Sequence, residues 1–135
     1  MNNDPTFTVA NVLSRVRKLK SHATYSADDC RLWTFDAIME LYTQAPKART
    51  LEDGGVRDLP DFFTVDTDIV PCSIRYLPLI IDYVMGRAFM QDGDSQEHST
   101  RSAQHFQLFF QRAHWVEYGP QGFNDRTQGV VKGRP

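Results

Sequence analysis

Few residues in this chain have the types and spacing that catalysis or metal binding requires. The imidazoles are His22, His98, His105 and His114. None belongs to the His-Glu-x-x-His pattern of zinc-hydrolase helices, and none lies at a zinc-motif distance from the cysteines. His98 and His105 fall two turns apart on one helical face, where hydrogen-bonding histidines are a better interpretation than a metal site. The sequence therefore predicts no bound metal and no cofactor.

Nucleophiles and phosphate-binding loops give no stronger signal. No serine sits in a Gly-x-Ser-x-Gly turn, and no glycine-rich loop is followed by Lys-Ser/Thr. Cys30 and Cys72 are predicted to be buried free thiols rather than a disulfide framework. Asp92-Gly93-Asp94 is too short for a calcium loop and is typical of a helix boundary, with Asp94 and Glu97 capping the next helix. We expect a protein that is not an enzyme; an enzyme using His105 and nearby acids is an alternative.

Charge limits the partners that the chain can take. The formal net charge is −2, whereas general binding to nucleic-acid phosphates requires a basic excess. One basic stripe stands on the first predicted helix: Arg15, Arg17, Lys18 and Lys20. It is either a solvated face or a contact to DNA or to another subunit. Arg87, inside an apolar helix, predicts either a carboxylate partner or an exit to solvent.

Size and composition indicate one globular domain. The chain has 135 residues, of which 41% are hydrophobic, enough for a single core. The apolar run 77–90 is interrupted by Asp82 and Arg87 and is shorter than the roughly 20 residues that span a bilayer. The first residues lack a secretory pattern. We expect a soluble protein made in the cytoplasm.

Apolar periodicity predicts four helices. The first carries the stripe Val9, Val12, Leu13, Val16 and Leu19 after a cap at Thr6 or Thr8. The second begins at Ser26, with Asp29 in the cap, and stops before Pro46. The third, from 77 to 92, is apolar around most of its circumference and should be central. The fourth runs from about 95 to 115 and is expected to pack through Ala103, Phe106, Phe110 and Ala113.

The remaining stretches are irregular. Residues 52–68 hold six acids and one base, a net charge of −5, and 62–65 is expected to be a short strand or an extended segment packed on the bundle. Residues 119–135 hold four of the eight glycines and little apolar surface. The expected fold is mainly α: a four-helix bundle with a loop or small β element between helices 2 and 3 and an extended C-terminal arm. We divide the chain into a helical domain, 1–118, and an arm, 119–135.

Two motifs resemble a known family. Asp82-Tyr83-Val84-Met85-Gly86-Arg87-Ala88 leads to an acidic turn and then to Ala103 and the aromatic step Phe106-x-x-Phe109. Upstream, the tryptophan helix 31–38 is similar to that family's second helix. Together they resemble the head–tail adaptor (connector) proteins of tailed double-stranded DNA phages, over about residues 28–112. Gly86 departs from the pattern, where a larger residue is expected, and permits a closer helix approach. The arm matches no part of the family pattern.

The resemblance implies a structural virion protein without catalytic activity. It implies a twelve-subunit ring below the portal protein, at the head–tail junction, which extends the DNA channel and supports tail nozzle or tube proteins. Genomic DNA would pass without sequence-specific binding, and no membrane is involved. The acidic stretch 52–68 is expected to face the channel. The expected portal contacts in the arm are Phe123, Arg126, Val130, Val131, Lys132 and Arg134. The alternative is a small helical DNA-binding or regulatory interaction protein.

Overall fold

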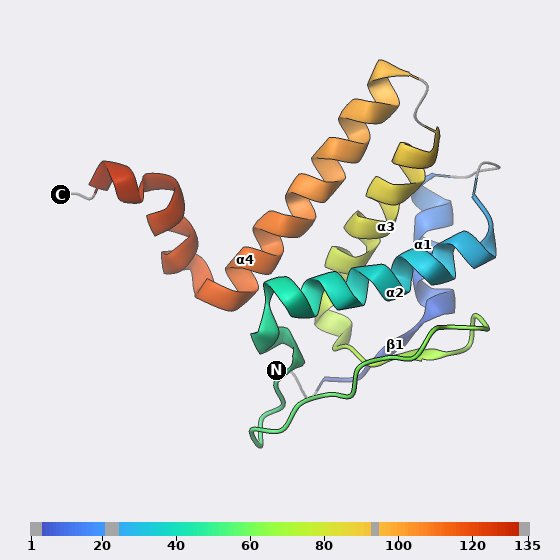
Figure 1. Cartoon of the computed structure of the whole chain (residues 1–135), viewed down its shortest axis with the longest axis horizontal. Coiled ribbons are helices and arrows are strands. Elements are labelled where there is room, and N and C mark those ends of the chain that lie inside the picture. The colour runs from blue at the N-terminus through green and yellow to red at the C-terminus, as the bar shows by residue number, and fades with distance from the viewer. Residues whose placement is uncertain (1–3, 21–24, 93–94, 133–135) are drawn as a thin grey trace.

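The chain folds into a mainly helical bundle, as the sequence predicts. The computed structural model describes residues 4–20, 25–92 and 95–132, with the side chains of the last helix up to Gly119. In chain order the elements are β1 (Phe7–Thr8), α1 (Val9–Leu19), α2 (Ala27–Gln44), the 3-10 turn η1 (Pro46–Arg49), β2 (Ile69–Val70), the 3-10 turn η2 (Ile74–Tyr76), α3 (Leu77–Asp92) and α4 (Gln96–Lys132). Figure 1 shows α3 surrounded by the other helices, with the two short strands at the base of the bundle.

Local hydrogen bonds fix where the first two helices begin. The Thr8 hydroxyl accepts from the Asn11 backbone N–H at 3.3 Å, and the Asn11 side chain accepts from the Thr8 N–H at 2.9 Å. Ser26 and Asp29 form the same reciprocal capping box at α2. The predicted caps at Thr8 and Ser26 are therefore confirmed. The predicted stripe of α1 is buried as far as Val16, whereas Leu19 is 64% exposed because the helix ends there, beyond the edge of the core.

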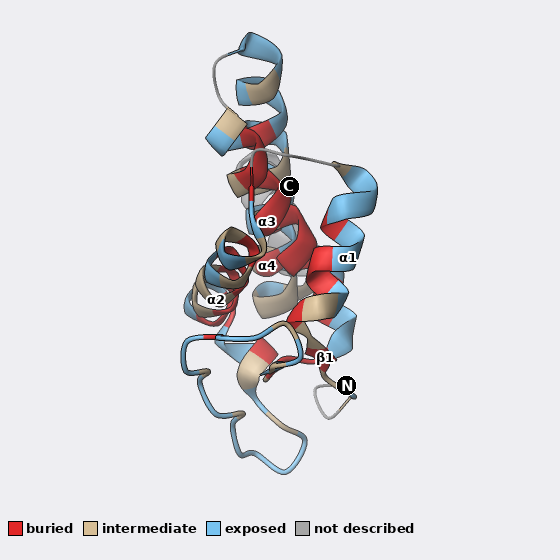
Figure 2. Cartoon of the chain, turned by 90° about the vertical axis from the view of Figure 1, so that its right-hand side faces the viewer, coloured by how far each residue is buried: buried red, intermediate tan, exposed pale blue. Residues whose placement is uncertain are grey.

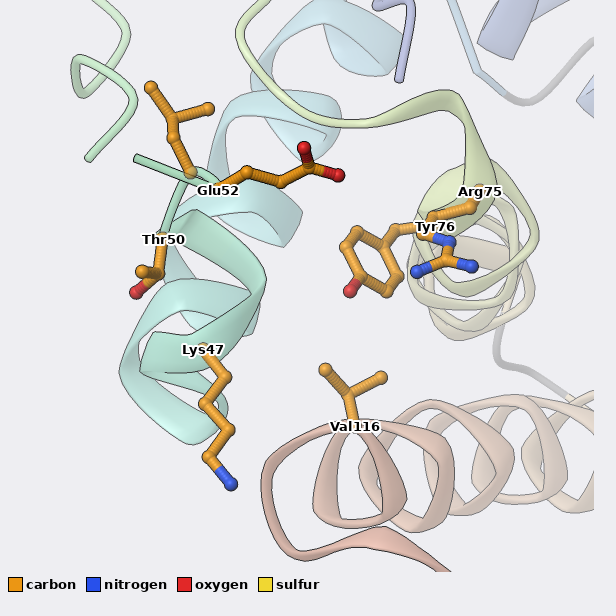
Figure 3. Close-up of a pocket in the computed structure, with 7 residues that line it drawn as sticks. Lys47, Thr50, Glu52, Arg75, Tyr76 and Val116 are labelled. Atoms are coloured by element: carbon orange, nitrogen blue, oxygen red, sulfur yellow. The ribbon is translucent and has the colours of Figure 1, made fainter. Parts of the chain in front are cut away.

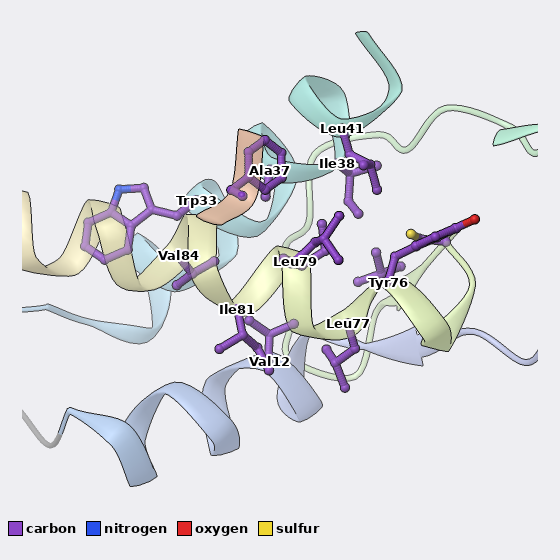
Figure 4. Close-up of a cluster of buried hydrophobic side chains, with 14 of the residues drawn as sticks. Val12, Trp33, Ala37, Ile38, Leu41, Tyr76, Leu77, Leu79, Ile81 and Val84 are labelled. Carbon is purple, nitrogen blue, oxygen red and sulfur yellow. The ribbon is translucent and has the colours of Figure 1, made fainter. Parts of the chain in front are cut away.

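Helix α3 forms the centre of the bundle. It packs against α1, α2 and α4, and Figure 2 shows it mostly in the colour of buried residues. Leu79, Ile80 and Val84 are among its ten buried residues, which lie on all sides of the helix. Figure 4 shows how side chains of α1 and α2 converge on this helix. The prediction of a central third helix is confirmed, since a helix that is apolar on every side is stable only when every side is covered.

Helices α3 and α4 approach each other closely around Gly86. A Cβ atom placed on Gly86 would lie 3.0 Å from the Phe106 ring, and the Ser102 hydroxyl donates to the Gly86 carbonyl at 2.8 Å. The inward face of α4 therefore carries Ser102, Phe109 and Ala113, with Phe106 beside them. The predicted face was wrong for Ala103 and Phe110, which are exposed. Ser102 faces Gly86 and bonds to its carbonyl, so the helix is rotated to place Ser102 inward instead of Ala103.

The segment between α2 and α3 has little regular structure. β1 and β2 pair antiparallel, with Phe7 opposite Val70. Residues 62–65 form no strand. They follow the other prediction, an extended segment packed on the bundle, and the Phe63 side chain is buried. Phe62 and Phe63 both make edge contacts with the Phe35 ring of α2, at centroid distances of 5.0 and 6.2 Å. The loop is therefore held by aromatic packing on one helix rather than by backbone pairing.

Helix α4 starts at Gln96, close to the predicted residue 95, but its end differs from the prediction. The Ser95 hydroxyl accepts from the His98 backbone N–H at 3.1 Å, so Ser95 caps the helix. The predicted cap Asp94 and the break at Gly93 lie outside the described residues. At the other end, Gly119 has non-helical angles (φ 73°, ψ 175°), and helical backbone resumes to Lys132. The arm is thus helical to Lys132 rather than extended, because Pro120 directly after the break suits the first turn of a new helix.

The close approach at Gly86 makes a direct prediction. Gly86→Leu places a side chain where the Phe106 ring lies, so we expect the free energy of unfolding to fall by about 1–3 kcal/mol. Ala103→Leu, on the exposed face of the same hairpin, serves as the matched control and should change it by less than about 0.5 kcal/mol. Urea unfolding followed by circular dichroism measures both. Equal stability of the two variants would contradict the packing described here.

Candidate functional site

A buried carboxylate joins α3 to α4. Asp82 is only 8% exposed, and its two oxygens accept from Arg112 Nη1 at 2.7 Å and face His105 Nδ1 at 3.0 Å. The His105 ring stacks on Phe89 at 5.7 Å with an interplanar angle of 10°. A charge at this depth requires such partners, since an unpaired buried carboxylate is strongly destabilising. The arrangement fixes the register of the two helices.

The same Asp–His pair is the closest approach to a catalytic arrangement. An acid beside an imidazole can orient a general base, which then needs a nucleophile at hydrogen-bond distance. In the described part of the chain, no serine, threonine or cysteine hydroxyl or thiol donates to His105. The nearby Ser102 hydroxyl is used by the Gly86 carbonyl. The geometry therefore supports a bracing role for His105.

Arg87 has the carboxylate partner that its position predicts. Its Nη1 donates to Asp36 of α2 at 3.0 Å and to the Tyr83 hydroxyl at 3.2 Å. The guanidinium carbon lies 5.9 Å from the centroid of the Trp33 ring. The side chain thus ties α2 to α3 by one ion pair and two aromatic contacts. The motif residues Asp82, Tyr83 and Arg87 all serve helix packing.

The two thiols are buried and unpaired, as predicted. Burial raises the pKa of Cys30 and of Cys72 to about 12 each. The nucleophilic form of a cysteine is the thiolate, which is scarce at neutral pH when the pKa is this high. The Tyr42 hydroxyl, whose pKa burial also raises, donates to the Pro71 carbonyl and packs near Cys72. Both cysteines therefore act as core side chains.

The basic stripe of α1 has three exposed members. Arg15, Arg17 and Lys18 are exposed, whereas Lys20 forms an ion pair with Asp92 and lies 5.0 Å from the centroid of the Phe89 ring. Lys20 therefore links the end of α1 to the end of α3 and is not part of an open cationic face.

Two other histidines weighed as possible metal ligands are His98 and His22. His98 packs against Phe89 at a ring distance of 5.7 Å. Within the described residues, no group of three or more histidine, cysteine and acidic side chains could hold a metal ion. His22 lies outside the described residues.

The predicted arm contacts stand on the helix that follows Gly119. Phe123, Arg126, Val130, Val131 and Lys132 belong to the helical backbone up to 132, and Arg134 lies outside the described residues. In Figure 1 this helix (red) turns away from the bundle and makes no packing layer with it. The described backbone places Phe123, Arg126, Val130, Val131 and Lys132 on one projecting segment.

An open groove lies beside the point where the arm departs. Its walls are η1, η2 and the end of the straight part of α4, and Figure 3 shows the Tyr76 and Val116 side chains pointing into it. The hollow of about 540 Å³ continues past Arg75 and Tyr76 into a second one of about 350 Å³ beside Arg112 and Trp115. Sequence reasoning missed this groove because its walls come from three separate segments. The one signal in the sequence is Trp115, an aromatic residue on the polar side of a helix.

The wall of the groove is fixed by a contact across 70 residues of sequence. The Glu117 carboxylate of α4 accepts from the Lys47 backbone N–H of η1 at 2.8 Å. This bond satisfies one of the free donors at the start of the 3-10 turn. The groove is thus a preformed feature, open to solvent, with Lys47, Glu52 and Arg75 among the residues that line it.

No protein family, characterised protein or solved structure was found to match this chain. Among the described helices, none has the length and apolarity needed to span a membrane.

The Asp82 network predicts a stability loss on truncation. Asp82→Ala leaves the Arg112 and His105 N–H groups without their acceptor. We expect the free energy of unfolding to fall by about 2 kcal/mol. This loss is smaller than that for a fully buried ion pair, because Arg112 is half exposed. Glu97→Ala breaks the exposed pair with Arg101 and should cost less than about 0.5 kcal/mol. Chemical denaturation compares the two. A loss for Asp82→Ala no larger than that for Glu97→Ala would exclude the bracing role.

The buried thiols predict a fall in stability at alkaline pH. Because the folded state raises the thiol pKa from about 9 to about 12, the unfolded chain releases these protons first, and stability should decline as pH rises above about 9. Denaturation midpoints between pH 8 and pH 11 measure the decline, which should be smaller in Cys30→Ala/Cys72→Ala. Iodoacetamide at pH 8 should alkylate both thiols in urea and neither in the folded protein; rapid alkylation of the folded protein would refute their burial.

Proposed function

We propose that this protein is a structural subunit of a phage head–tail junction, an adaptor ring that binds below the portal protein. The observation that carries the proposal is the projecting arm on a rigid helical body. A body braced by Asp82 and Arg87 can hold its shape under load, while a segment that stands away from it can reach a second protein. The resemblance of residues 28–112 to adaptor proteins supports the same assignment.

The composition of the arm suits a segment that binds by docking. Residues 119–135 hold three bases and one acid, a net charge of +2, around a few apolar side chains. Such a segment gains its apolar contacts from the partner, so attachment and ordering are coupled. We assign the portal contact to Phe123, Val130 and Val131, with Arg126, Lys132 and Arg134 beside them.

The rest of the proposed role follows from ring geometry. Twelve copies would continue the DNA channel from the portal and present a platform for the tail nozzle or tube proteins. Genomic DNA would pass through without sequence-specific contacts, and the protein would act in the virion after synthesis in the host cytoplasm. It would catalyse no reaction.

A second candidate, a small helical DNA-binding or regulatory protein, is favoured by one observation. Arg15, Arg17 and Lys18 are exposed together on α1. Three cations give a weak phosphate contact, and this hypothesis requires a salt-sensitive mobility shift with free DNA. An adaptor would show no such shift.

Deleting the arm tests the proposed function. We expect the full chain to form a ring on the portal protein of the same phage, and Δ119–135 to stay folded but to lose portal binding, because the arm carries the contact. Mass measurement of each protein alone and mixed with portal provides the readout, with circular dichroism as the folding control.

A matched pair of substitutions refines the deletion. Val130→Asp/Val131→Asp should abolish portal binding, whereas Thr127→Asp/Gln128→Asp, which adds the same charge to the same segment, should retain most of it. Full binding by Δ119–135 would exclude the arm as the portal contact. Absence of portal binding by the intact chain would exclude the adaptor assignment itself.

A further inference from the structure

The groove beside the arm has a cationic rim and an apolar floor. Lys47, Arg75 and Arg112 stand around it with a single lining acid, Glu52. The Arg75 and Arg112 side chains are 47% and 44% exposed, so each retains surface for a partner beyond its own ion pair. The floor is formed by Tyr76, Leu79 and Val116, and Trp115 is half exposed at one end. A surface of this kind suits a protein segment that combines acids with exposed apolar side chains.

The chain itself presents such a segment. We define the loop ridge as Asp58, Asp61, Phe62 and Val65. Phe62 is 60% exposed and Val65 50%, although the Phe35 contact holds Phe62 in place. Asp58 and Asp61 are exposed, and in the described part of the chain they make no ion pair. The ridge is therefore apolar, acidic and preorganised, which lowers the entropy lost on binding.

We propose that the groove of one copy binds the loop ridge of the next copy, in a head-to-tail contact. This inference rests on the proposed function, since it supplies the lateral contact of the ring. It assigns Asp58 and Asp61 to that contact instead of to the channel wall expected from the sequence. The aspartates of the ridge would face Lys47 and Arg75, and Phe62 would cover the apolar floor at Tyr76. The charge signs match. On the groove the exposed apolar side chain is Trp115, 51% exposed, whereas Tyr76 and Leu79 are buried and present only their outer edges.

The two surfaces are placed for ring formation. In Figure 1 the groove elements, η1 and the end of the straight part of α4, stand on one side of the body. The loop segment 60–68, which holds three of the four ridge residues, runs out to the other side. Asp58 stays near η1, because the neighbouring Arg57 N–H donates to the Arg49 carbonyl. No residue belongs to both surfaces. A contact between two different patches of identical chains repeats around an axis and closes into a ring when the rotation permits.

The other segment that could fill the groove is the arm of a neighbouring copy. Its net charge is +2, counted as three bases minus one acid, the same sign as the groove rim. Like charges brought together oppose docking, whereas the ridge brings two unpaired acids. Charge therefore selects the ridge over the arm.

Reciprocal charge reversal tests the contact. The groove variant is Lys47→Glu/Arg75→Glu, the ridge variant is Asp58→Lys/Asp61→Lys, and Arg15→Glu/Lys18→Glu on α1 is the matched control. Sedimentation velocity and native mass spectrometry measure self-association of each purified full chain, alone and with portal protein, with circular dichroism to verify folding.

We expect the groove and ridge variants each to self-associate about tenfold or more weakly than the unmodified chain, and the control to match it. A 1:1 mixture of the two variants should restore association in a ring where they alternate. The reversed ridge of one variant then meets the reversed groove of the other, and the native ridge of the second meets the native groove of the first. Recovery on mixing also shows that neither variant is misfolded.

Each other outcome overturns the inference. These outcomes are unchanged association of both variants, failure of the mixture to recover, and a chain that stays monomeric with and without portal. If the full chain self-associates without portal, loss of that portal-independent association on deleting 119–135 also overturns the inference, because it would assign the groove to the arm. Portal binding measured in the same samples separates the two proposals. If the chain binds portal and charge reversal has no effect, only the ridge contact fails; if association follows the charge rules and portal is not bound, only the adaptor role fails.

Discussion

The close contact between α3 and α4 is the constraint on which the structure depends. An almost wholly apolar α3 must be covered on every side, and α4 supplies the last side only because Gly86 has no side chain to hold it off. At that distance the buried Asp82 meets Arg112 and His105 of the facing helix, so the cost of burying its charge is offset by two charge-assisted contacts. The position of α4 then determines where Trp115 and Val116 stand, and hence where the groove opens.

Local signals in the sequence predicted most of the fold. Thr8 with Asn11 and Ser26 with Asp29 are contacts between residues three apart, and the stripe of α1 is visible as a period. Ala113 and Phe106 lie on the inward side of α4 as predicted, but Ala103 and Phe110 were assigned there wrongly, because apolarity alone favoured Phe110 over Ser102. The rotation of α4 depends on the space beside Gly86, which exists only when α3 and α4 are packed together. The same limit applies to the loop at 62–65, which packs on Phe35 instead of pairing as a strand.

The functional surfaces were less accessible to sequence reasoning for a related reason. Arg87 could be predicted to have a carboxylate partner, but not that Asp36, 51 residues away, would be it. The groove joins residues from 47 to 116, and only the fold brings them together. The acidic stretch is also less uniform than its composition implies. Asp66 pairs with Arg31, and Asp68 accepts from the Thr64 and Val65 backbone, so part of the negative charge holds the loop in shape.

The arm and the groove lie next to each other, and this proximity bears on the order of assembly under the proposed function. A subunit whose arm is bound to the portal is held near the neighbours bound beside it, at an effective concentration far above that in solution. A ridge-to-groove contact too weak to form rings in solution would then become favourable on the portal. Charge complementarity suits this arrangement, because exposed ion pairs contribute modest affinity but strong orientation. Separate surfaces for the portal and for the neighbour would let the ring grow only where a portal is present.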